Sequence, residues 1–410
     1  MKNSDKIAML IVARDFYPPF RVDVTTLFSK YLKKYLKMDW LMRTEERGPG
    51  KKITVEDETH YVIGRLGIRG KIDAVVKHLS AFGRILRKEY DIVQCRDTFL
   101  IASIYAIVSR LSGAKFVYWM SYPMEEGYLF RAQAAFDKGR YLQALPRWII
   151  GKLGQISLYR IALPLAHHVF VQSDQMKIDV AGEGVPDVKI TPVPMGIDTA
   201  TFLSEPGEIA SDAFYSGQKA ILYLGTLDPA RQMGIVAAGV AKAMRERSDT
   251  IFVLIGRASD AERSEILQYF ADLTSRIFFL DQMPLSMALK HVRRADVCLA
   301  PYPSSPKMLA SATPTKLVEY IAMGRRVVAN FHPDQSTVIA STGAGLLSDF
   351  SSEGFAKAIV DALDLGELTN TEVQRAEAWI RENRDYVALS EMVADVYVGD
   401  RRIRHSKAAD

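Results

Sequence analysis

Lys316 and Glu319 lie three residues apart in a segment whose pattern predicts a helix beginning at Pro314. Thr313 is a typical N-cap residue, proline suits the first position of a helix, and Gly324 is a typical helix end. The N-terminus of a helix presents unpaired N–H groups and a partial positive charge, so it can bind an anion. A lysine in the first turn opposes the usual preference for acids there, unless an anion lies in front of it.

These residue types suit a ligand that carries both phosphate and sugar hydroxyl groups. Lys316 would bind the phosphate, and Glu319 would accept hydrogen bonds from the hydroxyls. Taken alone, the pattern fits an ordinary helix with two solvated side chains equally well. The chain lacks a P-loop sequence, a dinucleotide-binding glycine pattern, paired cysteine and histidine spacings and any Asp-x-Asp pair. If a diphosphate leaves here, cations and a helix N-terminus must stabilise its charge, and no metal or other cofactor is expected.

The size and composition of the chain are typical of a globular protein with two domains. It has 410 residues, of which 48% are hydrophobic and 25% charged. The net charge of +5 is too small to indicate nucleic acid as a partner. Cys95 and Cys298 lie within apolar runs, so buried free thiols in a reducing compartment are expected. No signal peptide or bilayer-spanning segment is recognisable, and we expect a cytoplasmic protein.

Short apolar runs alternate with helical patterns along the chain, which predicts parallel sheets covered by helices. The runs are at 6–13, 90–95, 115–120 and 166–172, and then at 219–224, 251–255, 277–280, 297–300 and 326–329. We therefore predict an α/β fold with an N-terminal domain over 1–203 and a C-terminal domain over 204–380. A C-terminal helix over 381–410 is expected to pack back on the first domain and to end in a basic tail.

Ligands of open parallel sheets bind beyond the carboxyl ends of the strands. In the N-terminal half, that rule indicates that three loops face one cleft. These loops are at 15–21, 96–97 and 121–126.

Residues 131–165 combine cations with large apolar side chains. The segment contains six lysines and arginines against one acid, Asp137, and Trp148 lies among several leucines and isoleucines. An amphipathic segment of this kind can lie on an anionic membrane surface, which would make the protein peripheral on the inner face of the plasma membrane. A helix that packs on the core and exposes a basic face is the competing interpretation.

Four segments of the C-terminal half resemble, in their order and spacing, the family 4 glycosyltransferases. They are Tyr223–Arg231 (YLGTLDPAR), Phe252–Gly256 (FVLIG), Ala295–Tyr302 (ADVCLAPY) and Pro314–Asn330 (PTKLVEYIAMGRRVVAN). The N-terminal half resembles the family more loosely. The resemblance implies the GT-B fold, in which two Rossmann-like domains with parallel sheets face each other across a cleft. It also implies transfer of a sugar from a nucleotide sugar with retention of anomeric configuration.

Position by position, the resemblance assigns roles to residues of the C-terminal half. Arg231 and Lys316 would bind the donor diphosphate and Glu319 its ribose, and these three are the predicted catalytic set. Ser311 stands where many members have a glutamate, and Thr226 where an arginine is common. The donor-binding candidates are Gly225, Thr226, Gly256, Arg257, Met283, Ser311, Thr313, Pro314, Thr315, His332 and Gln335.

The resemblance implies that the N-terminal half binds the acceptor at its three loops. The family usually has a histidine after the strand at 115–120, where this chain has Ser121 and Tyr122. Another side chain must then take over the role of that histidine. The acceptor-side candidates are Arg21, Arg96, Asp97, Ser121 and Glu125.

The predicted function is therefore that of a retaining, metal-independent glycosyltransferase. It would move a sugar from a UDP- or GDP-sugar to a glycan or lipid-linked acceptor in the synthesis of a cell-surface polysaccharide. Its expected partners are this donor, this acceptor and an anionic membrane surface that meets 131–165. Two other functions stay open, a nucleotide-sugar epimerase of the same fold and a non-catalytic nucleotide-sugar-binding protein. The products formed from donor alone, and consumption of the donor, distinguish the three.

Overall fold

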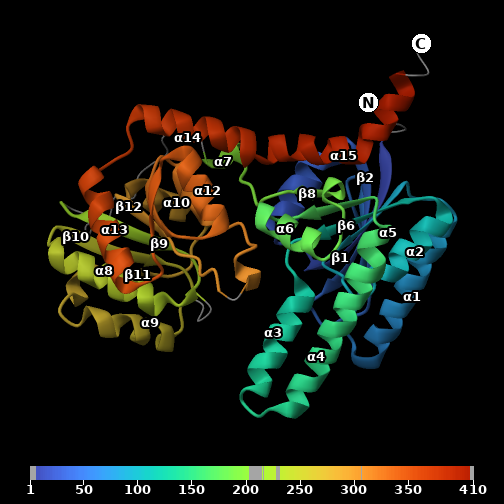
Figure 1. Cartoon of the computed structure of the whole chain (residues 1–410), viewed down its shortest axis with the longest axis horizontal. Helices are drawn as coiled ribbons and strands as arrows, with labels where there is room; N and C mark the ends of the chain where they lie inside the picture. Colours follow the sequence, from blue (N-terminus) through green and yellow to red (C-terminus); the bar gives the residue numbers. More distant parts are fainter. Residues whose placement is uncertain (1–5, 203–214, 216, 228–230, 306, 407–410) are drawn as a thin grey trace. The chain divides into compact units, whose positions relative to one another are not determined.

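The computed structural model describes residues 6–202, 215, 217–227, 231–305 and 307–406 (Figure 1). The chain forms two compact units. Unit 1 comprises Met1–Pro194 and Leu389–Asp410, and unit 2 comprises Met195–Ala388. Unit 1 is therefore built from two stretches of chain that are separated by the whole of unit 2. The sequence had placed the divisions at 203/204 and 380/381.

Unit 1 contains an eight-stranded sheet in the order β3-β4-β2-β1-β5-β6-β7-β8. The strands are β1 (Ile7–Tyr17), β2 (Leu36–Thr44), β3 (Lys51–Val55), β4 (Glu58–Ile63), β5 (Ile92–Arg96), β6 (Lys115–Met120), β7 (His168–Val171) and β8 (Ile190–Pro192). Neighbouring strands are parallel, apart from the antiparallel pair β3 and β4. Strand β2 begins at Leu36 and buries alternate residues as far as Trp40.

Helices cover both faces of this sheet. One face packs against α1 (Gly67–Leu86), α2 (Ala102–Ser112), the π-helix η4 (Ile156–Ala162), α5 (Leu163–Leu165) and α6 (Asp174–Gly182). The other face packs against the π-helix η2 (Asp23–Tyr31) and the last helix, α15 (Tyr386–Ser406). Tyr397 of α15 donates a hydrogen bond to Gln94 of β5, and its ring lies 5.4 Å from that of Phe170 on β7. The remaining helices, α3 (Met124–Phe136) and α4 (Tyr141–Gln155), form a hairpin (Figure 1).

Unit 2 contains a parallel six-stranded sheet in the order β11-β10-β9-β12-β13-β14. Its strands are β9 (Lys219–Leu224), β10 (Thr250–Ile255), β11 (Ile277–Leu280), β12 (Val297–Ala300), β13 (Arg326–Asn330) and β14 (Gly345–Ser348). Its helices are α7 (Thr199–Phe202), α8 (Met233–Glu246), α9 (Asp260–Leu267), α10 (Leu285–Arg294), α11 (Thr315–Ala322), α12 (Pro333–Thr342), α13 (Ser352–Leu365) and α14 (Asn370–Asn383). Alternate residues of β9 enter two separate apolar cores. The predicted α/β fold with two parallel-sheet domains is confirmed, whereas β14 was missed.

Candidate functional site

A small hollow lies in unit 2 where the carboxyl end of β12 meets the first turn of α11. Its walls combine cations with backbone from two loops. The lining residues are Arg231, Ala300, Pro301, Tyr302, Pro314, Thr315 and Lys316. The sequence predicted four of these, so the residues expected to bind a donor diphosphate do gather around one space.

The first turn of α11 has no side-chain cap. The helix begins at Thr315 with Pro314 in the N-cap position, one residue later than predicted. Thr313 is buried, and its hydroxyl accepts a hydrogen bond of 2.9 Å from the N–H of Met195. The prediction that Thr313 caps the helix is therefore wrong. The N–H groups at the start of α11 are left facing a hollow lined by Lys316, which is the arrangement that favours a bound anion.

Lys316 reaches from α11 across the loop that follows β9. Its Nζ donates a hydrogen bond of 3.2 Å to Tyr223 Oη and lies 4.6 Å from the centre of that ring. A methyl group added at Gly225 would come within 1.9 Å of Nζ. Burial, and then the positive charge of Arg231, lower the pKa of Lys316 to about 8, although Glu319 acts in the opposite direction. An anion in the hollow would stabilise the charged form of this lysine.

Arg231 is held on the opposite wall by an aromatic ring. Its guanidinium lies 4.4 Å from the ring centre of Tyr302, where a cation–π interaction is favourable. Asn330, at the end of β13, fixes the backbone of Tyr302: its Oδ1 accepts from the N–H at 2.7 Å and its Nδ2 donates to the carbonyl at 2.9 Å. The sequence prediction included neither Tyr302 nor Asn330. Asn330 could have been predicted as a site residue, because it is a polar side chain at the end of the apolar run Arg326–Asn330.

Glu319 is half-buried one turn further along α11. Burial raises its pKa, against the opposing effects of a hydrogen bond with Thr315 and the charge of Lys316. The three predicted catalytic residues thus come together in one electrostatically coupled group.

Two glycines let the ends of β9 and β10 approach each other. Gly225 and Gly256 have φ of +152° and +146°, values that side chains disfavour. A methyl group at Gly256 would lie 2.3 Å from the carbonyl oxygen of Gly225, a backbone atom that cannot swing aside. The position of the Gly225 loop under Lys316 therefore depends on the absence of a side chain at Gly256.

Gly256→Ala is expected to displace the Gly225 loop and to lower the affinity for a nucleoside diphosphate about tenfold or more, because small misplacements in a binding site are costly. Isothermal titration calorimetry measures this affinity. Gly182→Ala is the matched control, since the added methyl at the end of α6 meets no atom within 4 Å. Wild-type affinity in Gly256→Ala would contradict this role for the glycine.

Four other donor-binding candidates are buried side chains that hold loops. His332 Nε2 lies 2.9 Å from the carbonyl oxygen of Leu309, and Gln335 Nε2 donates to that of Ala300 at 2.6 Å. Ser311 and Thr313 are buried as well. None of the four lines the hollow, so we expect them to position its walls.

The last three donor candidates lie elsewhere in unit 2. Thr226 and Arg257 are exposed, and Arg257 Nη2 donates to Gln282 Oε1 at 3.4 Å. Met283 packs against the apolar core. These positions leave their contact with a donor as a prediction.

Four of the acceptor-side candidates form one polar network in unit 1. Arg96 is fully buried, and it donates from Nε to Asp15 at 3.0 Å and from Nη2 to Asp23. Arg21 binds Asp23 at 3.3 Å and lies 3.9 Å from Asp97. The side chain of Asp97 in turn accepts hydrogen bonds from the N–H and hydroxyl groups of Ser121. Because Arg96 is enclosed, we expect it to fix the loops; Asp15 and Asp23 were not predicted.

Glu125, the fifth acceptor-side candidate, is buried at the start of α3. Its Oε1 accepts a hydrogen bond of 3.1 Å from the hydroxyl of Tyr159. Burial raises the pKa of Glu125 to about 7, so this carboxyl group can exchange a proton near neutral pH. Its contact with a ligand stays a prediction.

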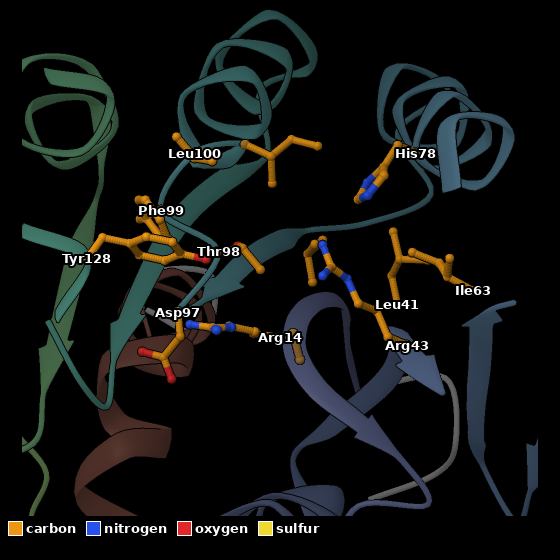
Figure 2. A pocket seen from close by; sticks show the side chains of 13 residues that line it. Arg14, Leu41, Arg43, Ile63, His78, Asp97, Thr98, Phe99, Leu100 and Tyr128 are labelled. Carbon is orange, nitrogen blue, oxygen red and sulfur yellow. The ribbon is translucent and has the colours of Figure 1, made fainter. Parts of the chain in front are cut away.

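A larger pocket opens at the carboxyl ends of β1, β2 and β5 in unit 1 (Figure 2). Within it, the side chain of Arg14 extends toward Asp97, whose carboxylate points away from the Arg14 guanidinium. Its other walls come from apolar and aromatic side chains, from Arg43 and Thr98, and from His78 of α1. Asp97 is the only acceptor-side candidate that lines this pocket.

The known proteins that this chain resembles agree with the architecture described. Residues 218–364 match the family described as "Glycosyl transferases group 1". No curated protein matches the chain. Several solved structures share its fold over almost its whole length. The chain has the GT-B fold.

Three of these structures illustrate the likeness. Anabaena HepE in complex with UDP has a TM-score of 0.65 and 15% identity, covering 96% of this chain and 100% of that one. Sucrose-phosphate synthase from Thermosynechococcus elongatus has a TM-score of 0.63 and 14% identity, covering 99% of this chain and 100% of that one. The α,α-trehalose-phosphate synthase (UDP-forming) from Burkholderia vietnamiensis has a TM-score of 0.63 and 13% identity, covering 95% of this chain and 99% of that one. Identities this low show a common fold alone.

Proposed function

We propose that this protein is a retaining glycosyltransferase that transfers a sugar from a UDP-sugar. The observation that carries the proposal is the hollow at the first turn of α11, where Lys316 and Arg231 face an uncapped helix N-terminus. The match of residues 218–364 to group 1 glycosyl transferases supports the reaction class, and the UDP bound to Anabaena HepE supports the choice of base. Retention of configuration and membership of family 4 belong to the proposal.

In this reaction the bond between the anomeric carbon and the UDP oxygen breaks, and an acceptor hydroxyl oxygen bonds to that carbon. The hydroxyl proton passes to the departing diphosphate, on which negative charge develops. The two cations and the N–H groups of α11 would stabilise that charge from fixed positions, which is the main form of catalysis such a site can offer. Glu319 would orient the nucleotide through its ribose. The proposed chemistry uses no metal ion.

We extend the proposal to the acceptor side. The acceptor would be a glycan or a lipid-linked sugar that becomes part of a cell-surface polysaccharide, and the protein would act in the cytoplasm at the inner face of the plasma membrane. The cluster of polar groups at the carboxyl ends of β1 and β5 supports an acceptor site in unit 1.

A thermal-shift panel of nucleotides and nucleotide sugars tests the donor assignment. A ligand that binds only the folded state stabilises it by about 2.7 kcal/mol at a hundred times its Kd. UDP and a UDP-sugar are therefore expected to raise Tm. GDP is expected to leave Tm unchanged, because the proposed site does not bind it. Stabilisation by GDP alone would contradict the choice of base. Product analysis then distinguishes the functions: an epimerised nucleotide sugar would indicate an epimerase, and binding without consumption of donor would indicate a non-catalytic protein.

The affinity for UDP is expected to fall as pH rises through about 8. Burial and the charge of Arg231 set the pKa of Lys316 there in the free protein, so the lysine loses its positive charge above that pH. Calorimetric titration with UDP on both sides of pH 8 measures the change. Lys316→Arg is the control, because arginine stays charged and should flatten the dependence. If the affinity of Lys316→Arg for UDP fell equally steeply with pH, a group other than Lys316 would be responsible for the pH dependence.

A further inference from the structure

The outer side of three neighbouring helices in unit 1 is apolar. Helix α2 packs between α1 and η4, and the inner residues of all three belong to the core. On a helix that faces water, the residues on the outer side are usually polar. Instead, a set of large apolar side chains on these helices is exposed, and those of α2 recur at helical spacing. They are Ile68, Ile72, Val75, Val76 and Leu79 on α1, Leu100, Ile104, Ile107 and Leu111 near or on α2, and Ile156 and Ile161 on η4. We call this set the apolar face.

Helix α4 adds further residues to the apolar face, because it buries small side chains and exposes large ones. Its buried residues are small: Ala144, Gly151 and Gly154. A methyl group at Gly151 would meet the side chain of Leu129, and one at Gly154 would meet Phe99. The large residues point outward, namely Tyr141, Leu142, Leu145, Trp148, Ile149 and Leu153, with Leu142 at 95% exposure. The competing interpretation, a helix that packs on the core and exposes a basic face, holds for Ile150, which packs against the core of unit 1, but not for these six exposed side chains.

The charges around the apolar face are mostly positive. Helices α2 and α4 contain no acidic residue, and Asp73 of α1 pairs with Lys77. Exposed cations border the apolar residues: Arg69, Lys71, Arg110, Arg131, Lys138, Arg140, Lys152 and Arg160. A second copy of this chain would bring the same charges against them and be repelled. A bilayer with anionic headgroups offers both apolar depth and opposite charge.

The pocket of unit 1 opens at the edge of this face. Leu100 is exposed beside α2 and also lines the pocket, and His78 lines it from α1. Arg14 and Arg43 contribute cations at the ends of β1 and β2. The one carboxylate among the lining residues, Asp97, is held by Ser121. Apolar side chains at the mouth and arginines inside suit an amphiphile with an anionic headgroup.

We infer that the apolar face docks on an anionic bilayer, and that the pocket binds the phosphate-bearing headgroup of a membrane lipid. The role of this lipid as the sugar acceptor rests on the function proposed above. None of the described helices has both the length and the hydropathy to cross a bilayer, so the docking is interfacial.

Vesicle sedimentation tests the docking. The full chain is expected to bind phosphatidylcholine vesicles that contain phosphatidylglycerol at least about tenfold more tightly than pure phosphatidylcholine vesicles, and less tightly as salt rises. Ile104→Ser with Ile107→Ser removes apolar side chains that would enter the bilayer and is expected to weaken binding about tenfold or more. Val188→Ser is the matched control, because Val188 is 89% exposed on the 3₁₀-helix η5 (Asp187–Lys189).

Two results would overturn the docking. One is equal affinity for the two kinds of vesicle. The other is a dimer in light scattering that the double serine variant converts to monomer, because the face would then join two copies.

Thermal shift with three probes tests the headgroup. Dodecyl phosphate, below its micelle concentration, is expected to raise Tm, whereas inorganic phosphate and dodecyl maltoside are not. Arg43→Gln is expected to weaken the binding of dodecyl phosphate about tenfold, the usual scale for a lost charge-assisted hydrogen bond. Arg381→Gln, an exposed position in unit 2, is the control. An equal effect of inorganic phosphate would indicate a site for soluble phosphate, and an equal effect of the maltoside would exclude headgroup recognition.

UDP binding separates failure of this inference from failure of the proposed function. The serine variants and Arg43→Gln are expected to keep the wild-type Tm rise with UDP, because they lie in unit 1 and the donor site lies in unit 2. A protein that binds UDP but neither vesicles nor dodecyl phosphate would overturn the membrane inference alone. A protein that binds both lipid probes but no nucleotide sugar would overturn the function and leave the docking surface.

Discussion

Lys316→Met is expected to lower turnover by about 10²–10³, the usual cost of losing one preorganised charge-stabilising group. The variant should still fold, because methionine keeps the apolar stem of the lysine and the Tyr223 hydroxyl still donates its hydrogen bond to the carbonyl oxygen of Thr226. Steady-state kinetics with a UDP-sugar and thermal unfolding of the same samples measure the two effects. Lys357→Met, at an exposed lysine of α13, should change neither. Near wild-type turnover would refute the phosphate-binding role of Lys316.

The same variant should raise stability at neutral pH. Burial lowers the pKa of Lys316 from 10.5 to about 8, so the charged amine destabilises the fold at any pH below 8. As pH rises from 8 to 10.5, the unfolded chain holds more protons on this lysine than the folded protein, and the wild type gains stability. The advantage of methionine is therefore about 1–3 kcal/mol at pH 7 and vanishes above the unfolded pKa. Unfolding curves on both sides of this window test the sign.

Arg96→Met is expected to destabilise the protein by about 3–5 kcal/mol, the usual cost of leaving one half of a buried ion pair. The change leaves the carboxylates of Asp15 and Asp23, both more than nine-tenths buried, without their main partner. Urea unfolding at neutral pH measures the loss. Arg87→Met breaks only a surface pair with Glu89 and should cost about 1 kcal/mol or less.

The penalty of Arg96→Met should shrink in acid. In the wild type, burial raises the pKa of Asp23, but the charges of Arg96 and Arg21 outweigh it and hold this pKa below its usual value. The wild type therefore loses this contribution as pH falls through the lowered pKa. In the variant, burial dominates and the carboxyl group protonates at a higher pH, which relieves the buried charge. Arg96→Met with Asp23→Leu should recover much of the stability, and no recovery would contradict a paired role.

The sequence predicted the fold well where each strand has its own apolar run. Runs such as Ile251–Ile255 are buried on both faces, so their composition alone marks them. Strands β2, β3, β4 and β8 were missed. Strand β3, Lys51–Val55, is mostly exposed and polar, so it has no apolar run of its own. Strand β14, Gly345–Ser348, is short and only half-buried. Such segments become strands through the neighbours with which they pair, which a local pattern does not contain.

The candidate site was predictable where one helix carries it. Lys316 and Glu319 are placed by the phase of α11, and the residues around the hollow follow from the ends of parallel strands. Tyr302 and Asn330 were missed because their pairing joins two strands that are 28 positions apart in sequence. Asp23 belongs to a network that forms only when β1, β5 and η2 meet. Contacts over such separations depend on tertiary structure, and the spacing of residue types does not specify them.

The return of the chain to unit 1 after Ala388 has a consequence for biosynthesis. Tyr397 fills a place between Gln94 and Phe170 on the sheet of unit 1. A ribosome adds about 5–20 residues per second, so this tyrosine is made roughly 10–40 s after Pro194. During that interval the sheet of unit 1 is complete in sequence but uncovered where α15 will pack. The nascent chain therefore leaves this surface uncovered until α15 is made, and unit 2 can finish folding first.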